Sequence, residues 1–186
     1  MSNYKAIVSS DWNECLAPTG PFDPILFHYP NLEPSLRSIF KRYTGNEIPL
    51  SRALQELQSL LPSELTAEQI DAYLEDSFCT YKGVPRFIDW CREHDILFLI
   101  NTTAFYGFFQ RVLAKDLLPR VAAVSAHPML CFPESGSDPD RFYPLLEIED
   151  KGKNTAKAMA DFRIPKGKVV VVGDSGGDGP HFAWAG

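Results

Sequence analysis

The chain has few cysteines and no apolar run long enough to cross a membrane. Its four cysteines are scattered, without C-x-x-C pairs or ligand-like spacing to histidine, which argues against a disulfide framework and a zinc site. Basic residues are outnumbered by acidic ones, 18 to 24, and the net charge of −6 gives no electrostatic footprint for nucleic acid or an anionic membrane. No signal peptide precedes the first apolar run. We therefore expect a soluble, cytoplasmic protein.

Apolar runs alternate with helical stripes along much of the chain. With 186 residues, 45% of them hydrophobic, the chain can build one well-cored domain with a modest insertion. Strands that alternate with helices predict an α/β fold with a parallel sheet and right-handed crossovers. We expect the first and last strands to be buried on both faces. The expected strands are residues 4–10, 96–100, 121–125 and 169–172, and the turn-rich residues 133–144 are expected to form a loop or a hairpin.

The segment after the first strand has a different pattern. Residues 17–34 carry five prolines, a density that predicts an exit from the core without a regular element. Apolar residues then recur at helical spacing, and Thr66 with Gln69 forms a capping-box pattern. The expected helices cover residues 36–43, 50–61 and 66–78. Residues 21–80 therefore read as an all-helical insertion.

Acidic residues follow the first and last expected strands. Asp11 comes after the first, and Asp174 and Asp178 lie in a glycine-rich stretch after the last. Because the carboxyl ends of parallel strands meet in one crevice, we expect these side chains to lie close together. A carboxylate at such a place serves as a nucleophile or as a ligand for a hard cation such as Mg²⁺.

Two further residues complete a set suited to phosphoryl transfer. Thr102 follows the second expected strand, and Lys151 opens a helix, with Lys153 an equally good choice. Transfer of a phosphoryl group to a carboxylate needs a nucleophile, a metal ion, and cationic or hydroxyl groups for the remaining oxygens. Each residue type alone is more often a helix cap, a turn residue or a solvated charge. Their joint placement favours the functional interpretation.

The ordered set resembles the motifs of the haloacid-dehalogenase (HAD) superfamily of phosphohydrolases. The helical insertion after the first motif, and Lys151-Gly152 at a helix start, look most like the phosphoserine-phosphatase-like branch. The D-x-D-x-T motif falls on residues 11–15, the hydroxyl motif on Thr102, the lysine motif on Lys151, and the G-D-x-x-x-D motif on Gly173, Asp174 and Asp178.

The resemblance implies a three-layer Rossmann-like core, residues 1–20 and 81–186, with a helical cap inserted after the first strand, residues 21–80. It implies a Mg²⁺-dependent phosphomonoester hydrolase that acts on a small phosphorylated substrate through an aspartyl phosphate on Asp11. In this family residues 182–186 would start a helix that leads to a further edge strand, so the resemblance implies that this chain lacks that strand or is truncated. The implied metal ligands are Asp11, the main-chain carbonyl of Asn13, Asp174 and Asp178, and the implied catalytic residues are Asp11, Asn13, Thr102 and Lys151.

Asn13 departs from the pattern, because the second Asp of the first motif is the general acid/base in these phosphatases. An amide side chain cannot exchange a proton near neutral pH, and loss of a positioned acid/base typically costs about 10²–10⁴ in rate. Glu14 is a conceivable substitute acid. Three hypotheses stay open: a slow hydrolase or one with a different acceptor, a phosphate- and metal-binding or regulatory protein without turnover, or a substitution introduced by engineering.

Two alternatives remain, one for the fold class and one for the arginines of the insertion. A receiver-like domain that is phosphorylated on Asp also fits a parallel sheet, but the helical insertion and the late second acidic cluster disfavour it. In the insertion, Arg37, Arg42 and Arg52 are conceivable substrate contacts, and for each of them a solvated surface charge is the preferred interpretation.

Overall fold

A five-stranded parallel sheet lies at the centre of the computed structural model, which describes residues 4–186; residues 1–3 of the predicted core lie outside the described residues. The strand order is β4-β3-β2-β1-β5. The strand β1 lies between β2 and β5: the chain runs outward from β1 through β2 and β3 to β4, and then returns to β5 on the other side of β1. A crevice therefore opens above the carboxyl end of β1, where the direction of winding changes. The strands are β1 (Ala6–Ser10), β2 (Ile96–Phe105), β3 (Ala123–His127), β4 (Arg141–Pro144) and β5 (Val169–Val172).

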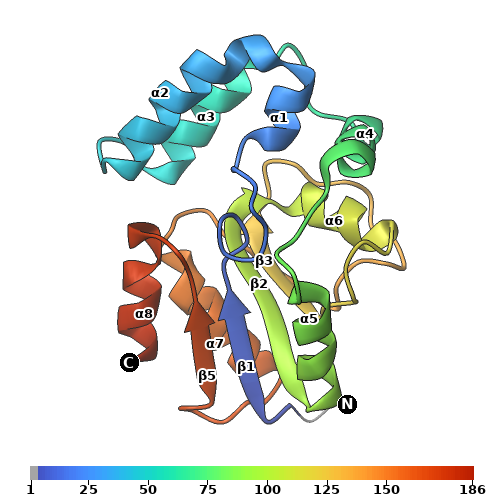
Figure 1. Cartoon of the computed structure of the whole chain (residues 1–186). Coiled ribbons are helices and arrows are strands. Elements are labelled where there is room, and N and C mark those ends of the chain that lie inside the picture. The colour runs from blue at the N-terminus through green and yellow to red at the C-terminus, as the bar shows by residue number, and fades with distance from the viewer. Residues whose placement is uncertain (1–3) are drawn as a thin grey trace.

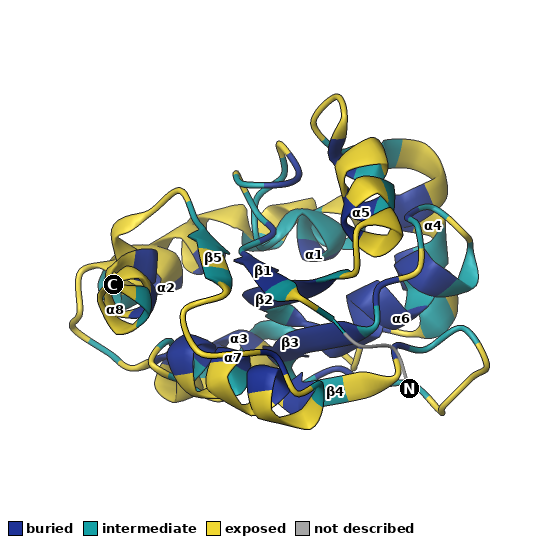
Figure 2. Ribbon diagram, turned by 90° about the horizontal axis from the view of Figure 1, so that it is seen from below, coloured by how far each residue is buried: buried dark blue, intermediate teal, exposed yellow. Residues whose placement is uncertain are grey.

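Helices cover both faces of the sheet, which gives three layers (Figures 1 and 2). The helices α5 (Val84–Glu93) and α6 (Tyr106–Ala114) pack on one face, and α7 (Asp150–Asp161) packs on the other with α8 (Gly179–Ala185) beside it. Successive strand residues point to opposite faces, so Val8 joins the first apolar cluster and Ile7 the second. The predicted three-layer α/β fold is confirmed.

Four helices connect β1 to α5 and lie above the carboxyl ends of the strands (Figure 1). The Thr66 capping box is present, because its side chain accepts a hydrogen bond from the Gln69 amide at 3.3 Å. Among the described residues, no helix is long and apolar enough to span a bilayer. The division at residues 21 and 80 stays a prediction. These helices are α1 (Asp23–His28), α2 (Glu33–Thr44), α3 (Leu50–Leu60) and α4 (Ala67–Ser77).

Contacts on two sides fasten these helices to the core. On one side, the Arg111 guanidinium of α6 donates two hydrogen bonds of 2.7 Å to the Asp71 carboxylate of α4. On the other, the Glu147 carboxylate, just before α7, accepts from the amides of Leu50 and Ser51 at 2.9 and 3.1 Å. Glu147 therefore caps the first turn of α3 from outside its own segment.

Residues 17–34 were predicted to contain no regular element, but the structure shows helices in this proline-rich segment. The helix α1 has Pro24 in its first turn, a short 3₁₀ helix spans Pro30–Leu32, and α2 has Pro34 in its first turn. The first helical N–H groups have no intrahelical acceptor, so proline is well tolerated at these positions. Proline density there marked helix starts, and the prediction of an irregular segment was wrong.

Three strand predictions also need correction. The strand β2 runs on to Phe105, past a register irregularity after Asn101, so Thr102 lies inside it. Residues 141–144 form β4, which pairs in parallel with β3 and is therefore no hairpin. The strand β5 is an edge strand, because among the described residues only β1 pairs with it, and its Val170 is 56% exposed.

Candidate functional site

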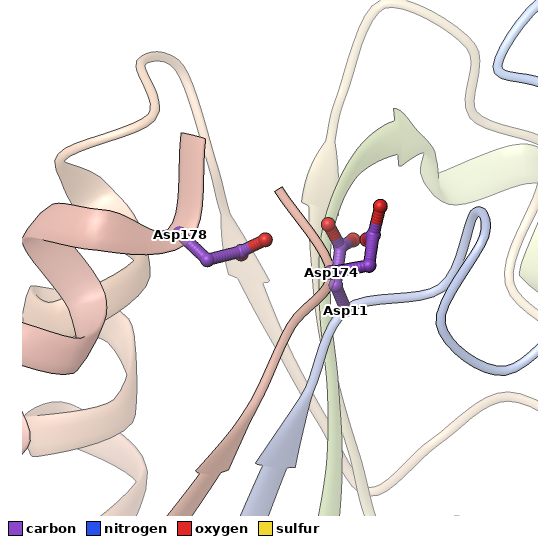
Figure 3. Close-up of side chains that lie close together, drawn as sticks. All are labelled: Asp11, Asp174 and Asp178. Carbon is purple, nitrogen blue, oxygen red and sulfur yellow. The ribbon is translucent and has the colours of Figure 1, made fainter. Parts of the chain in front are cut away.

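Three carboxylates converge above the carboxyl ends of β1 and β5 (Figure 3). Asp11 follows β1, Asp174 follows β5, and Asp178 lies just before α8. Because β1 and β5 are neighbours, their ends bring Asp11 and Asp174 together. One carboxylate oxygen from each of the three residues lies within 4.8 Å of the others. The expected acidic cluster is therefore present.

Lys151 lies beside this cluster at the start of α7. Its side chain is 1% exposed, and Nζ is 2.9 Å from Asp11 Oδ2 and 2.6 Å from Asp178 Oδ1. Burial alone lowers the pKa of Lys151, but the charges of Asp11 and Asp178 outweigh burial, so its pKa is raised and the ammonium persists. Lys153 is exposed and pairs with Asp150 instead. Of the two lysines that the sequence left open, Lys151 is the one at the acidic cluster.

Asp178 is held from two directions. Its Oδ1 accepts from Lys151, and its Oδ2 accepts from the Ser175 amide at 3.3 Å and the Ser175 hydroxyl at 3.2 Å. Gly173 allows this carboxylate to pack against the chain, because a Cβ on Gly173 would lie 2.7 Å from the Asp178 Cβ. The absence of a side chain at Gly173 therefore lets the Asp178 side chain approach the main chain closely.

A buried polar network that was not predicted from the sequence supports the main chain at Lys151. Asn101 Nδ2 donates to the Lys151 carbonyl at 2.9 Å, to Ser9 Oγ at 3.1 Å and to Thr155 Oγ1 at 3.0 Å. Thr155 Oγ1 is also 3.0 Å from His181 Nε2. The available signal was the polar residues Ser9 and Asn101 inside apolar strand runs, since buried polar groups need partners.

Asn13 and Thr102 lie differently from the charged residues. The Asn13 side chain donates from Nδ2 to the Thr19 carbonyl at 3.0 Å, which ties it to the following loop. Thr102 is 1% exposed, and its hydroxyl accepts from the Ala104 amide at 3.2 Å. The neighbouring Thr103, and not Thr102, lines the cavity at the acidic cluster.

That cavity has a volume of about 400 Å³ and lies between the core and the inserted helices. Glu14 is exposed on its wall with a φ of 59°, in the left-handed region that non-glycine residues rarely adopt. The core contributes Asp11, Asn13, Lys151 and Asp174 among others, and the insertion contributes Pro21, Phe40, Tyr43, Thr44 and Asn46.

The chemistry of this donor set fits a hard divalent cation. Two ligands about 2.1 Å from one Mg²⁺ are at most about 4.2 Å apart, so the carboxylate oxygens within 4.8 Å need to approach only slightly. Burial, and then the charges of Asp11 and Asp178, raise the pKa of Asp174. A cation would relieve this repulsion, and the carboxylate of Asp174 is exposed on the cavity wall.

Searches of family models and of curated protein sequences find no match to this chain. Among solved structures, a phospho-aspartyl intermediate analogue of phosphoserine phosphatase superposes with a TM-score of 0.74 at 18% identity, over 98% of this chain and 84% of that one. The chain has the fold of the HAD phosphatases. A substrate-bound phosphoserine phosphatase complex gives 0.74 at 18% identity, over 98% and 83%. A HAD family hydrolase from Salmonella enterica serovar Typhi gives 0.74 at 14% identity, over 98% and 61%.

Proposed function

We propose that this chain with a HAD-phosphatase fold is a Mg²⁺-dependent phosphomonoester hydrolase for a small phosphorylated metabolite. The carrying observation is the ion-paired cluster of Asp11, Lys151 and Asp178, which adjoins a cavity at the carboxyl end of β1. A carboxylate beside a buried ammonium suits attack on a phosphoryl group. The similar fold of a phosphoserine phosphatase described as a phospho-aspartyl intermediate analogue supports Asp11 as nucleophile.

Asp11, Asp174 and the main-chain carbonyl of Asn13 would hold the Mg²⁺ ion, with Asp178 beside them. The bound ion would neutralise charge on the phosphoryl oxygens. Asp11 retains acceptor capacity for this role, because each of its oxygens has one donor in the chain, Trp12 N for Oδ1 and Lys151 Nζ for Oδ2. Asp178 accepts from Lys151 and Ser175, so its main contribution is to fix the ammonium beside Asp11.

In the first step, an Asp11 oxygen attacks phosphorus, the ester P–O bond breaks, and the alcohol oxygen leaves with the bonding electrons. The Lys151 ammonium stabilises negative charge on the phosphoryl oxygens, and we propose that Thr102 or the cavity-lining Thr103 contributes a hydroxyl. In the second step, water attacks phosphorus, inorganic phosphate leaves, and the Asp11 carboxylate is restored. The leaving oxygen takes a proton from solvent in the first step, and the attacking water gives a proton to solvent in the second, so the net reaction converts ester and water into alcohol and inorganic phosphate.

Asn13 makes both proton transfers slow. Its amide neither protonates the leaving oxygen nor deprotonates the water, and its Nδ2 is committed to the Thr19 carbonyl. Glu14 lies on the cavity wall as an exposed residue, so burial does not fix its carboxylate in place. Asn13 is also the observation that favours the second candidate function, a phosphate- and metal-binding or regulatory protein without turnover.

We also propose that residues 21–80 act as a cap that closes over the ester, with residues 1–20 and 81–186 as the core. Cavity walls contributed by both parts support this division. Closure of such a site over the ester would exclude water during the transfer to Asp11, and opening would admit the water that the second step needs.

The first test is phosphate release from a panel of small phosphomonoesters, with and without Mg²⁺. We expect slow release that requires Mg²⁺ and is abolished by Asp11→Asn. If neither the native chain nor Asn13→Asp releases phosphate while Mg²⁺ and inorganic phosphate still bind in calorimetry, the binding-protein candidate replaces the hydrolase.

A further inference from the structure

The cavity wall carries very little positive charge. Asp11, Glu14 and Asp174 supply carboxylates, whereas Lys151 is the only lysine or arginine among the lining residues. The Lys151 ammonium already contacts Asp11 and Asp178, so it is committed to the phosphoryl end of the site. The Mg²⁺ ion that Asp11 and Asp174 would hold serves the same phosphoryl group, so a second anionic group on the substrate would find no further lysine or arginine among the lining residues.

The arginines of the inserted helices do not change this. Arg42 donates to the Glu56 carboxylate at 2.7 Å, and it lines a separate groove on the other side of α2. Arg52 donates to the same carboxylate at 3.0 Å, and Arg37 pairs with Glu33. Of the three substrate contacts that the sequence suggested, none lines the cavity.

The wall opposite the acidic cluster is aromatic and neutral. Phe40 and Tyr43 contribute rings whose centroids lie 6.5 Å apart, and Thr44 and Asn46 add uncharged polar groups. Burial, and then the nearby carboxylates, raise the pKa of Tyr43 to about 12, so its hydroxyl stays neutral. This wall offers apolar contact and neutral hydrogen bonds.

An apolar recess adjoins the cavity at this wall. The recess and the cavity share Pro21, Phe40, Tyr43 and Thr103 as lining residues, so the two lie side by side. The remaining walls of the recess come from the apolar faces of α2 and α3 and from the end of β2, including Ile39, Leu54, Leu57 and Phe105. The recess has a volume of only about 40 Å³, so an apolar group attached to the phosphate would pack in the main cavity against Phe40 and Tyr43.

Building on the proposed hydrolase activity, we propose that the substrate is a phosphomonoester of an uncharged, apolar alcohol, and not of an amino acid or another anionic alcohol. An ionised carboxylate on the leaving group would be desolvated beside Phe40 and Tyr43 without a cation to pair with. An apolar body gains free energy by burial against the same rings. The wall therefore selects by exclusion of charge as well as by apolar contact.

A matched pair of esters tests this assignment. Benzyl phosphate and 4-carboxybenzyl phosphate differ in one carboxylate, and phosphoserine represents the amino-acid class. With Mg²⁺, we expect kcat/KM for benzyl phosphate to exceed both others by at least about tenfold, in the native chain and in Asn13→Asp. Equal values, or a preference for either anionic ester, would overturn the substrate assignment and leave the hydrolase proposal intact.

Binding of non-hydrolysable phosphonates tests the substrate assignment independently of the proposed hydrolase activity. If no ester is hydrolysed, the hydrolase proposal fails, and the phosphonate analogues of the benzyl pair still report on the wall. We expect benzylphosphonate to bind the native chain with Mg²⁺ at least about tenfold more tightly than 4-carboxybenzylphosphonate. Equal affinities, or no binding of either compound, would refute the assignment.

A positive charge added to the aromatic wall should change the preference between the two benzyl esters. Phe40→Arg should shift the kcat/KM ratio toward the carboxybenzyl ester by about tenfold or more, since it supplies the missing cation. Ser38→Arg is the matched control, because Ser38 is exposed on the same helix and lines the separate groove. An unchanged ratio in Phe40→Arg with a folded protein, or the same shift in Ser38→Arg, would contradict the role of this wall.

Discussion

Lys151 shows what a single side chain contributes at the site. It lies buried between two carboxylates, and its removal would leave both without their common partner. We predict that Lys151→Met abolishes phosphate release and lowers the free energy of unfolding in urea by about 3–5 kcal/mol. Lys153→Met is the control, since Lys153 is exposed, and it should change neither quantity measurably. Equal effects of the two substitutions would contradict the assignment of Lys151.

His181 gives the site region a dependence on pH. It is 2% exposed, and burial, followed by the charge of Lys151, lowers its pKa to about 4. Between this value and the ordinary value of about 6.5, the unfolded chain binds more protons than the folded chain, so folding is weakened as pH falls through that window. The full contribution is present above pH of about 6.5 and amounts to at most about 3 kcal/mol.

Urea unfolding of the native chain and of His181→Gln, between pH of about 4.5 and 7, measures this effect. The stability difference between the two proteins should shift in favour of the variant as pH falls. His94→Gln is the matched control, because His94 is exposed, and its pH profile should follow that of the native chain. Parallel profiles for the native chain and His181→Gln would contradict a neutral, buried His181.

At the scale of elements, the loop between β5 and α8 sets the position of Asp178. A Cβ on Gly173 would meet the Asp178 side chain, whereas a Cβ on Gly176 would have no heavy atom within 4 Å. We predict that Gly173→Ala displaces Asp178, lowers stability by about 1–3 kcal/mol and abolishes phosphate release. Gly176→Ala should retain both properties. The pair is measured by urea unfolding and phosphate release, and loss of activity in Gly176→Ala alone would reverse the assignment.

Over the whole molecule, local sequence patterns predicted which segments form helices and strands better than they predicted how these elements pack against one another. Periodicity identified α2, α3, α4, β1 and β5, because helical stripes and apolar runs depend only on residues close together in the sequence. The exposure of β5 was missed, because a strand's position in the sheet depends on pairing between distant segments. The helix α1 was missed because proline disfavours helix interiors and favours helix starts, and composition alone does not separate the two.

The same distinction holds for the site. Motif order led to Asp11, Lys151, Asp174 and Asp178, which the fold brings together. The choice of Lys151 over Lys153 needed the helix orientation, and the Asn101 network needed the packing of α7 on β2. The neutral wall at Phe40 likewise depends on which face of α2 turns toward the core, and the arginines on that helix obscured it in the sequence.

Asp11 is proposed to accept the phosphoryl group, and Asn13 to slow its release. Intact-protein mass spectrometry after mixing with Mg²⁺ and 4-nitrophenyl phosphate tests both parts, because this leaving group needs no proton from the protein. We expect one phosphoryl adduct that accumulates on the native chain and is absent in Asp11→Asn. In Asn13→Asp the adduct should be replaced by steady turnover, about 10²–10⁴ faster than in the native chain. No adduct on the native chain together with no gain in Asn13→Asp would show that Asp11 is not the phosphoryl acceptor and that Asn13 does not limit turnover.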